Sequence, residues 1–155
     1  MRKFRHAVES AVLLIVRLGF GAGLFYRGLT RVLDGSDAYV ATLVAAGLPW
    51  PTVFFWGSVA LEMGGGVMLA AGVLTRLVGA VLVVQFVMTT AWIHWWNGFF
   101  VRDNGYEYAV AQGLLGLVLA GFGGGVVAVD QLIFGRKKNK DKDVTAATMA
   151  DVIAP

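Results

Sequence analysis

Residues 11–33 read AVLLIVRLGFGAGLFYRGLTRVL, an apolar stretch with few polar interruptions. A transmembrane helix needs about 20 predominantly apolar residues, so this stretch is long enough to cross a bilayer once. Similar stretches occupy about residues 52–73, 77–96 and 106–129. The sequence therefore predicts an all-α membrane protein whose residues 1–134 form one bundle of four transmembrane helices.

Composition and charge predict how this bundle is oriented. Hydrophobic residues make up 57% of the chain and charged residues 15%, which leaves little material for a soluble domain. Basic residues gather near both ends, within residues 2–5 and 136–142. Because basic flanks stay on the cytoplasmic side of a membrane, we expect both termini in the cytoplasm. By the same rule, we attribute the net charge of +3 to membrane orientation and to contacts with lipid head groups, and not to nucleic-acid binding.

The connections between the predicted helices also carry signals. Residues 38–46 form a short amphipathic segment, which ends before Pro49 and Pro51 because a continuous helix does not tolerate them. Trp50 suits a membrane interface, so we expect a short interfacial helix on the outer surface between the first two spans. Residues 135–155 are charged and contain nothing that builds a core, so we expect a disordered cytoplasmic tail.

Two charged residues lie inside the predicted spans, Arg17 in the first and Glu62 near the centre of the second. A charge at that depth costs about 2.5 to 3.5 kcal/mol on insertion scales, so it normally faces a partner or a cavity. Both residues share helix faces with small or polar neighbours, which favours positions inside the bundle. An antiparallel pair of helices puts Glu62 about five residues, roughly 7 to 8 Å, above Arg17. We therefore predict a buried Arg17–Glu62 pair, either as a structural lock or as a polar lining for a quinone head group, a small anion or a proton path.

Three further polar residues extend this lining. Gln85 lies in the third span, and Tyr108 and Gln112 share one face of the fourth. We predict that they line the interior beside the charged pair. Hydrogen bonds between helices explain the two glutamines equally well.

A second polar group is expected near the outer surface, and it comprises Arg27, Arg31, His94 and Glu107. Surface solvation accounts for interfacial charges in general, and Glu107 also opens a predicted helix, where a carboxylate is favoured. Arg27 lies more than a turn inside the first span, so it needs a carboxylate or carbonyl nearby. His94 is expected to be a hydrogen-bonded interfacial residue, and a proton role stays open because imidazole titrates near neutral pH.

The chain contains no cysteine, which excludes disulfide relays, cysteine-ligated iron–sulfur clusters and thiolate catalysis. Its two histidines, His6 and His94, are expected on opposite sides of the membrane, so we expect no haem and no metal site. Redox chemistry would then depend on a bound molecule, such as a quinone, or on a partner protein.

Two pairs of glycines have the GxxxG spacing that allows helices to approach closely, Gly19 with Gly23 and Gly121 with Gly125. Packing inside the monomer and packing between copies use such glycines equally well. The spacing therefore leaves both the monomer and an oligomer open.

A series of short motifs is spread over roughly residues 11–132. They are Val16-Arg17-Leu18-Gly19, Gly28-Leu29 with Arg31, Gly47-Leu48-Pro49, Leu61-Glu62 with Gly64-Gly65, Gly72-Val73-Leu74-Thr75-Arg76, Asn97-Gly98-Phe99-Phe100 and Gly105-Tyr106-Glu107-Tyr108. Through their order and spacing the chain resembles the DoxX family of four-helix bacterial membrane proteins. The family pattern also places an arginine at Arg17 and a glutamate at Glu62, without giving either a catalytic role.

The resemblance implies a multi-pass protein of the bacterial cytoplasmic membrane. Some relatives are associated with thiosulfate:quinone oxidoreduction or with membrane redox complexes. The leading hypothesis is therefore an integral-membrane subunit of a redox system, which binds quinone or anchors a soluble oxidoreductase and is not a complete enzyme alone.

Two other functions stay open. The protein could be a structural or assembly subunit whose glycine-rich faces dock into a larger membrane complex, as a homo- or hetero-oligomer. A third hypothesis, ranked below these, is a small-solute or proton transporter, for which four helices are few unless the protein oligomerises.

Overall fold

The computed structural model describes residues 2–125 and 128–130, with side chains from residue 8 onward. Its helices are α1 (Arg2–Leu33), α2 (Asp37–Ala45), α3 (Pro51–Ala71), α4 (Thr75–Thr89), the π-helical turn η1 (Thr90–His94), the 3-10 turns η2 (Trp95–Asn97) and η3 (Val101–Asp103), and α5 (Glu107–Phe122). No strand occurs in the described part of the chain, which agrees with the predicted all-α class.

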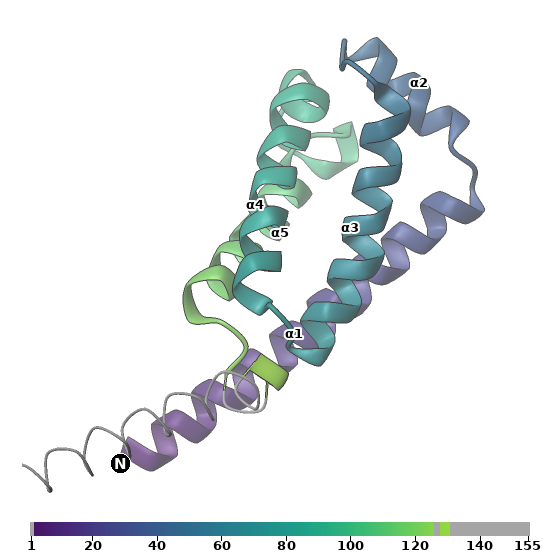
Figure 1. The fold of residues 1–155 in the computed structure, drawn as a ribbon. Coiled ribbons are helices and arrows are strands. Elements are labelled where there is room, and N and C mark those ends of the chain that lie inside the picture. Colours follow the sequence, from purple (N-terminus) through teal and green to yellow (C-terminus); the bar gives the residue numbers. More distant parts are fainter. Residues whose placement is uncertain (1, 126–127, 131–155) are drawn as a thin grey trace, which may run out of the picture.

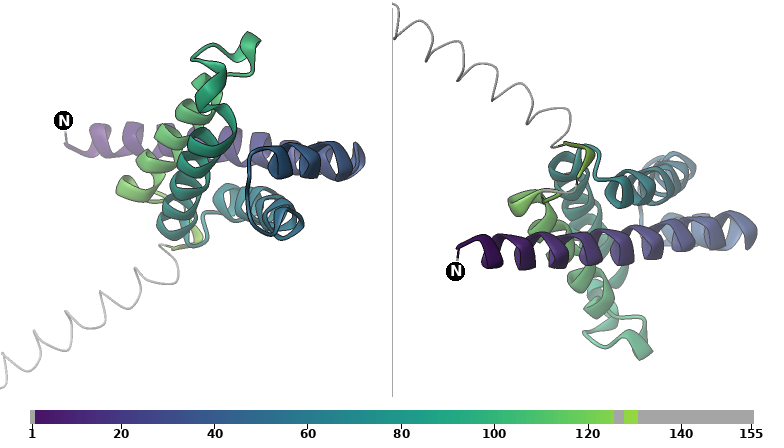
Figure 2. Two further views of the ribbon diagram at one scale, coloured as in Figure 1. Left: turned by 90° about the horizontal axis from the view of Figure 1, so that it is seen from above. Right: turned by 90° about the horizontal axis from the view of Figure 1, so that it is seen from below.

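The four long helices form two pairs (Figure 1). α1 packs along α3, and α4 packs along α5, whereas the two pairs touch each other less extensively. α1 lies at a wide angle to α4 and α5 (Figure 2). α2 packs on the first half of α3, where Leu43 joins Phe55 and Val59 in a small apolar cluster. The groups between the two pairs are therefore the ones that hold the halves together.

Glycines set the spacing within each pair. A Cβ added at Gly66 of α3 would lie 2.6 Å from the carbonyl oxygen of Gly21 on α1. A Cβ added at Gly79 of α4 would lie 2.8 Å from the carbonyl oxygen of Gly116 on α5. Larger residues do not fit at these crossings, so these glycines fix the register of both pairs.

The two predicted GxxxG motifs do not make these crossings. An added Cβ at Gly19, Gly23 or Gly121 would meet no described atom within 4 Å. Gly125 lies near Leu13 of α1. The first motif therefore points to open surface and not into the bundle.

One leucine from each long helix forms the middle of the core. Leu24, Leu69, Leu82 and Leu119 are each 0% exposed and belong to one apolar cluster. The four long helices thus meet in a layer of closely packed leucine side chains.

In the part of the chain that the structure describes, three helical segments are long and apolar enough to cross a membrane, Val8–Leu33, Pro51–Ala71 and Thr75–Asn97. α5 is apolar but has 16 residues, about 24 Å of helix, which is short of the about 30 Å of a hydrocarbon core. The fourth helix was predicted to reach residue 129, and this boundary is wrong. It ends at Phe122 because Gly123 adopts a φ of 74° that an α-helix does not contain.

The outward side chains of the long helices are apolar. Val53, Val67, Leu77 and Leu114 are each more than half exposed. Lipid accommodates such a surface and water does not, so the chain is an integral membrane protein. A fourth crossing and cytoplasmic termini remain predictions, and the predicted tail at residues 135–155 lies outside the described residues.

Candidate functional site

Glu62 is the centre of a cluster of charged and amide groups. Its side chain is 0% exposed, and Oε1 accepts hydrogen bonds from Arg31 Nη1 at 2.9 Å and from Gln85 Nε2 at 3.2 Å. Arg27 Nε lies 3.7 Å from the same oxygen. We call Arg27, Arg31, Glu62 and Gln85 the polar centre. One buried carboxylate therefore faces two guanidinium groups.

Gly28 explains how two arginines of α1 reach one carboxylate of α3. A Cβ added at Gly28 would lie 3.3 Å from Glu62 Cβ, so the two helices are close together at this level. Arg27 and Arg31 are four residues apart and share a helix face on either side of this level. Their side chains therefore converge on Glu62.

Arg27 also connects the polar centre to α5. Its Nη1 donates to Gln112 Oε1 at 2.6 Å, and Gln112 Nε2 donates to the Tyr108 hydroxyl at 2.9 Å. The guanidinium group lies 5.3 Å from the ring centroid of Tyr108 and 6.0 Å from that of Phe86, within the range of cation–π attraction. The predicted lining residues Tyr108 and Gln112 thus lie next to the polar centre.

Arg31 connects the polar centre to α2 and to the next turn of α3. Its Nη1 donates to Ser58 Oγ at 3.3 Å, and its Nη2 donates to the Tyr39 hydroxyl at 3.3 Å. The guanidinium group also lies 4.3 Å from the Tyr39 ring centroid. Tyr39 was not predicted as a site residue, because its partner Arg31 is on another helix and the sequence does not show that the two helices meet there.

Arg17 belongs to a different site, and the predicted Arg17–Glu62 contact is not formed. Arg17 is 2% exposed and donates through Nε to the carbonyl of Leu69 at 3.1 Å and through Nη2 to that of Ala70 at 3.3 Å. Its Nη1 donates to the carbonyl of Gly124. All three acceptors are backbone carbonyls.

The register of α1 against α3 explains this correction. A Cβ added at Gly72 would lie 2.9 Å from Arg17 Cζ, so Arg17 is level with the end of α3. Glu62 lies almost three turns earlier, about 15 Å along the helix axis. The predicted offset was about half of that, and the sequence carries no signal for which glycines meet.

The carbonyls that Arg17 binds belong to helix ends. Leu69 and Ala70 lie in the last turn of α3, and Gly124 follows α5. The last carbonyls of a helix lack intrahelical donors and carry the negative end of the helix dipole. Arg17 therefore ties the last turn of α3 to the segment that follows α5, and the carboxylate of Asp130 adds an electrostatic attraction to the buried cation.

Asp130 caps α4 at the same end of the bundle. Its Oδ1 accepts from the Leu74 backbone N–H at 2.7 Å and its Oδ2 from that of Thr75 at 2.9 Å. A carboxylate at a helix N-terminus satisfies free donors and is favoured by the dipole. Sequence reasoning missed Asp130, because it acts on residues 55 and 56 positions away.

The predicted outer group divides into two parts. His94 Nδ1 lies 2.7 Å from the carbonyl oxygen of Asn104, and Glu107 Oε2 accepts from the Val101 backbone N–H at 3.1 Å. Both contacts organise the loop between α4 and α5. Arg27 and Arg31 turn inward instead, because Glu62 offers them a buried carboxylate. Among the described residues, no group of three or more acidic, histidine or cysteine side chains is arranged to hold a metal.

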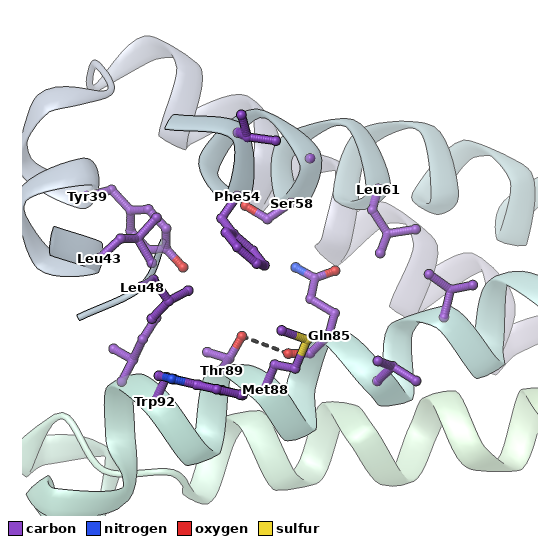
Figure 3. Close-up of a pocket in the computed structure, with 15 residues that line it drawn as sticks. Tyr39, Leu43, Leu48, Phe54, Ser58, Leu61, Gln85, Met88, Thr89 and Trp92 are labelled. Carbon is purple, nitrogen blue, oxygen red and sulfur yellow. Dashed lines mark hydrogen bonds between the residues drawn. The ribbon is translucent and has the colours of Figure 1, made fainter. Parts of the chain in front are cut away.

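A cavity of about 290 Å³ lies between α2, α3 and α4 (Figure 3). We call it the α2–α4 pocket. Its lining is mostly apolar and includes Leu43, Leu48, Val53, Phe54, Gly57, Leu61, Val81, Val84, Met88, Trp92 and Ile93. Val53, Val81 and Val84 are exposed at the molecular surface, so the pocket opens on the apolar outer surface of the bundle.

The α2–α4 pocket touches the polar centre through one residue, Gln85. Gln85 donates a hydrogen bond to Glu62 and also lines the pocket. Two further lining residues, Tyr39 and Ser58, accept hydrogen bonds from Arg31 of the polar centre. Figure 3 shows the amide of Gln85 reaching from α4 toward Ser58 and Leu61 on α3. Within the described residues, Gln85 Oε1 and Glu62 Oε2 are buried and have no hydrogen-bond partner.

Apolar outer faces, together with an apolar core that holds a few buried charges, define a multi-helix integral membrane protein with a mostly apolar pocket. The chain belongs to the DoxX family, whose model matches residues 12–95, from α1 to the start of η2. No curated protein and no solved structure matches the chain. The family match includes all four residues of the polar centre and ends before α5.

Proposed function

We propose that this protein is an integral-membrane subunit of a redox system in the bacterial cytoplasmic membrane, and that it binds a quinone head group in the α2–α4 pocket. The observation that carries the proposal is the pocket itself, which is apolar, opens toward lipid and has an amide of the polar centre in its wall. A quinone matches these features of the pocket, because it combines an apolar ring with polar oxygens. It also reaches its site through lipid.

The size and the polar groups of the pocket support this proposal. Its volume of about 290 Å³ is at the lower end of small-molecule sites, about 300–1,000 Å³, so one ring fits and a long tail extends into lipid. Gln85 has a second amide N–H besides the one that Glu62 accepts, and the Tyr39 oxygen accepts from Arg31, which leaves its own hydrogen free to donate. Both can bind a quinone oxygen.

The redox partner is part of the proposal. The chain has no cysteine, so the electrons that reach a bound quinone come from another protein, such as a soluble oxidoreductase anchored at the membrane. This chain supplies the site where the ring is bound and oriented.

A pair of matched glycines tests the pocket. Gly57 and Gly64 lie two turns apart on α3, and an added Cβ meets no described atom within 4 Å at either position. Only Gly57 lines the pocket. We expect Gly57→Phe to weaken binding of a short-chain benzoquinone at least tenfold, and Gly64→Phe to leave it unchanged, in titrations of the nanodisc-embedded protein followed by tryptophan fluorescence. No saturable binding by the unmodified protein, or equal effects of both substitutions, would contradict the proposal.

The open glycines of α1 favour a second candidate, an assembly subunit of a larger membrane complex. Gly19 and Gly23 present a surface on which another helix can pack closely. Native mass spectrometry of the protein extracted from its membrane tests this role. A stable complex that dissociates when both glycines are replaced by leucine, together with no quinone binding, would favour assembly over quinone binding.

A further inference from the structure

We propose that the α2–α4 pocket orients its ligand along the helices, with the ring beside α2 and the hydrocarbon chain of the ring held between α3 and α4. The inference rests on the proposed quinone site and adds a binding site for the chain. Its basis is the order of aromatic, polar and aliphatic side chains along the pocket, which follows α3 from Val53 to Leu61. This part of the helix is about 12 Å long.

The two ends of the pocket differ in chemistry. The end beside α2 has aromatic and hydroxyl groups, which Tyr39, Phe54 and Trp92 supply. Figure 3 shows Phe54 of α3 and Trp92 on opposite sides of the pocket. The other end, which we call the aliphatic end, is lined by Leu61, Val81 and Val84. A ring that carries oxygen atoms therefore suits the first end, and a hydrocarbon chain suits the second.

A contact between α3 and α4 closes the pocket beyond the aliphatic end. A Cβ added at Gly65, one turn after Leu61, would lie 3.2 Å from Val78 Cγ1 of α4. Val78 is buried, so the two helices pack directly at this level. At the aliphatic end itself, Val81 and Val84 are 41% and 59% exposed. A bound chain therefore leaves the pocket sideways, past Val84, and does not continue between the helices.

The depth of the aliphatic end matches the orientation of a lipid. Leu61 lies at the middle of α3, whereas Phe54 lies in its first turn. Because α3 is long enough to cross a membrane, a ligand bound in this way has its ring near one membrane surface and its chain directed toward the middle of the bilayer. An amphiphile of that leaflet already has this orientation. It therefore enters the pocket from lipid without turning over.

The selectivity of the aliphatic end depends on shape. Lipid is as apolar as this end of the pocket, so moving the chain out of lipid contributes little hydrophobic free energy. Fit decides instead, because an apolar pocket discriminates by about tenfold or more between ligands that differ by one methylene group. Filling the aliphatic end should therefore exclude a ring with a chain and spare a ring without one.

The test compares two ligands and two matched variants of the full chain in nanodiscs, by titrations followed with tryptophan fluorescence. Val84 and Val87 are 59% and 61% exposed on α4, and of the two only Val84 lines the pocket. We expect Val84→Phe to weaken binding of 2-heptyl-1,4-benzoquinone about tenfold and to change binding of 2-methyl-1,4-benzoquinone less than about twofold. Val87→Phe should change neither. Each variant is compared with the unmodified protein for the same ligand, so partitioning of the ligand into lipid cancels.

Photolabelling of the unmodified protein tests the same site without a substitution. A 2-heptyl-1,4-benzoquinone with a diazirine in its chain should label the aliphatic end, as read by mass spectrometry of the labelled peptides. Labelling spread over the other exposed apolar faces would show that membrane lipid occupies the aliphatic end instead, which overturns the chain site.

The outcomes separate the two proposals. If both quinones bind and Val84→Phe affects them equally, or affects neither, the chain site is overturned while the quinone site stands. An equal loss of the heptyl ligand in Val87→Phe also overturns it, because the effect is then not specific to the pocket. If neither quinone binds to the unmodified protein, the proposed function itself fails.

Discussion

Replacing Glu62 by glutamine should destabilise the protein more than most single substitutions. Glutamine keeps the shape and one acceptor for Arg31 and Gln85, but two guanidinium groups then share a buried site without an anion. Their side chains are 12% and 22% exposed, so solvent screens them weakly. Removing one partner of a buried pair costs about 3–5 kcal/mol, and the retained acceptor suggests the lower end, about 3 kcal/mol.

A double-mutant cycle decides which arginine is the partner of Glu62. The free energy of unfolding is measured by SDS titration in mixed micelles, with circular dichroism as the readout, for Glu62→Gln, Arg31→Gln, Arg17→Gln and the two double variants. Neighbouring groups couple by about 0.5–3 kcal/mol, so Glu62 and Arg31 should couple in this range. Glu62 and Arg17 have no shared partner among the described contacts and should be additive within about 0.5 kcal/mol.

Two results would refute this reasoning. One is a Glu62→Gln variant that unfolds at the same SDS fraction as the unmodified protein, because the carboxylate would then not compensate buried charge. The other is a coupling of Glu62 with Arg17 as large as that with Arg31, because the two helices would then have the register first expected from the sequence.

Two further predictions concern the other end of the bundle and the helix crossings, and both are measured by the same unfolding titration. Arg17→Lys should lose about 1–3 kcal/mol, because one ammonium group does not reproduce three directed bonds to carbonyls; unchanged stability would show that charge alone suffices. Gly21→Ala should lose about 1–3 kcal/mol, since its Cβ would lie 2.5 Å from Gly66 O. Gly19→Ala is its matched control, because it meets open space and should be neutral or stabilising. Equal losses in both alanine variants would contradict the assigned crossing.

Most of the fold could be predicted from the sequence because hydropathy and chain breakers act locally. The long apolar runs gave the helices, Pro49 and Pro51 separated α2 from α3, and the DoxX resemblance is confirmed by the family match. The end of α5 was misjudged, since an apolar run continues past Gly123 and only the backbone angle of that residue shows the break.

The site was harder to predict, because pairing between helices depends on register. The sequence identified Arg17 and Glu62 as costly charges, and both are buried. Their partners follow from which glycines interlock, and many glycines in these helices were candidates. Arg27 was recognised as needing a partner, but hydropathy does not show that the partner is Glu62.

The four buried leucines have a consequence for the movement of charge. They lie between the polar centre and Arg17, where every long helix contributes one side chain. Moving a proton or an ion across such an apolar layer is energetically costly, because the layer offers no polar side chain to bind it. In the conformation described, the four leucine side chains place an apolar barrier between Glu62 and the Arg17 site.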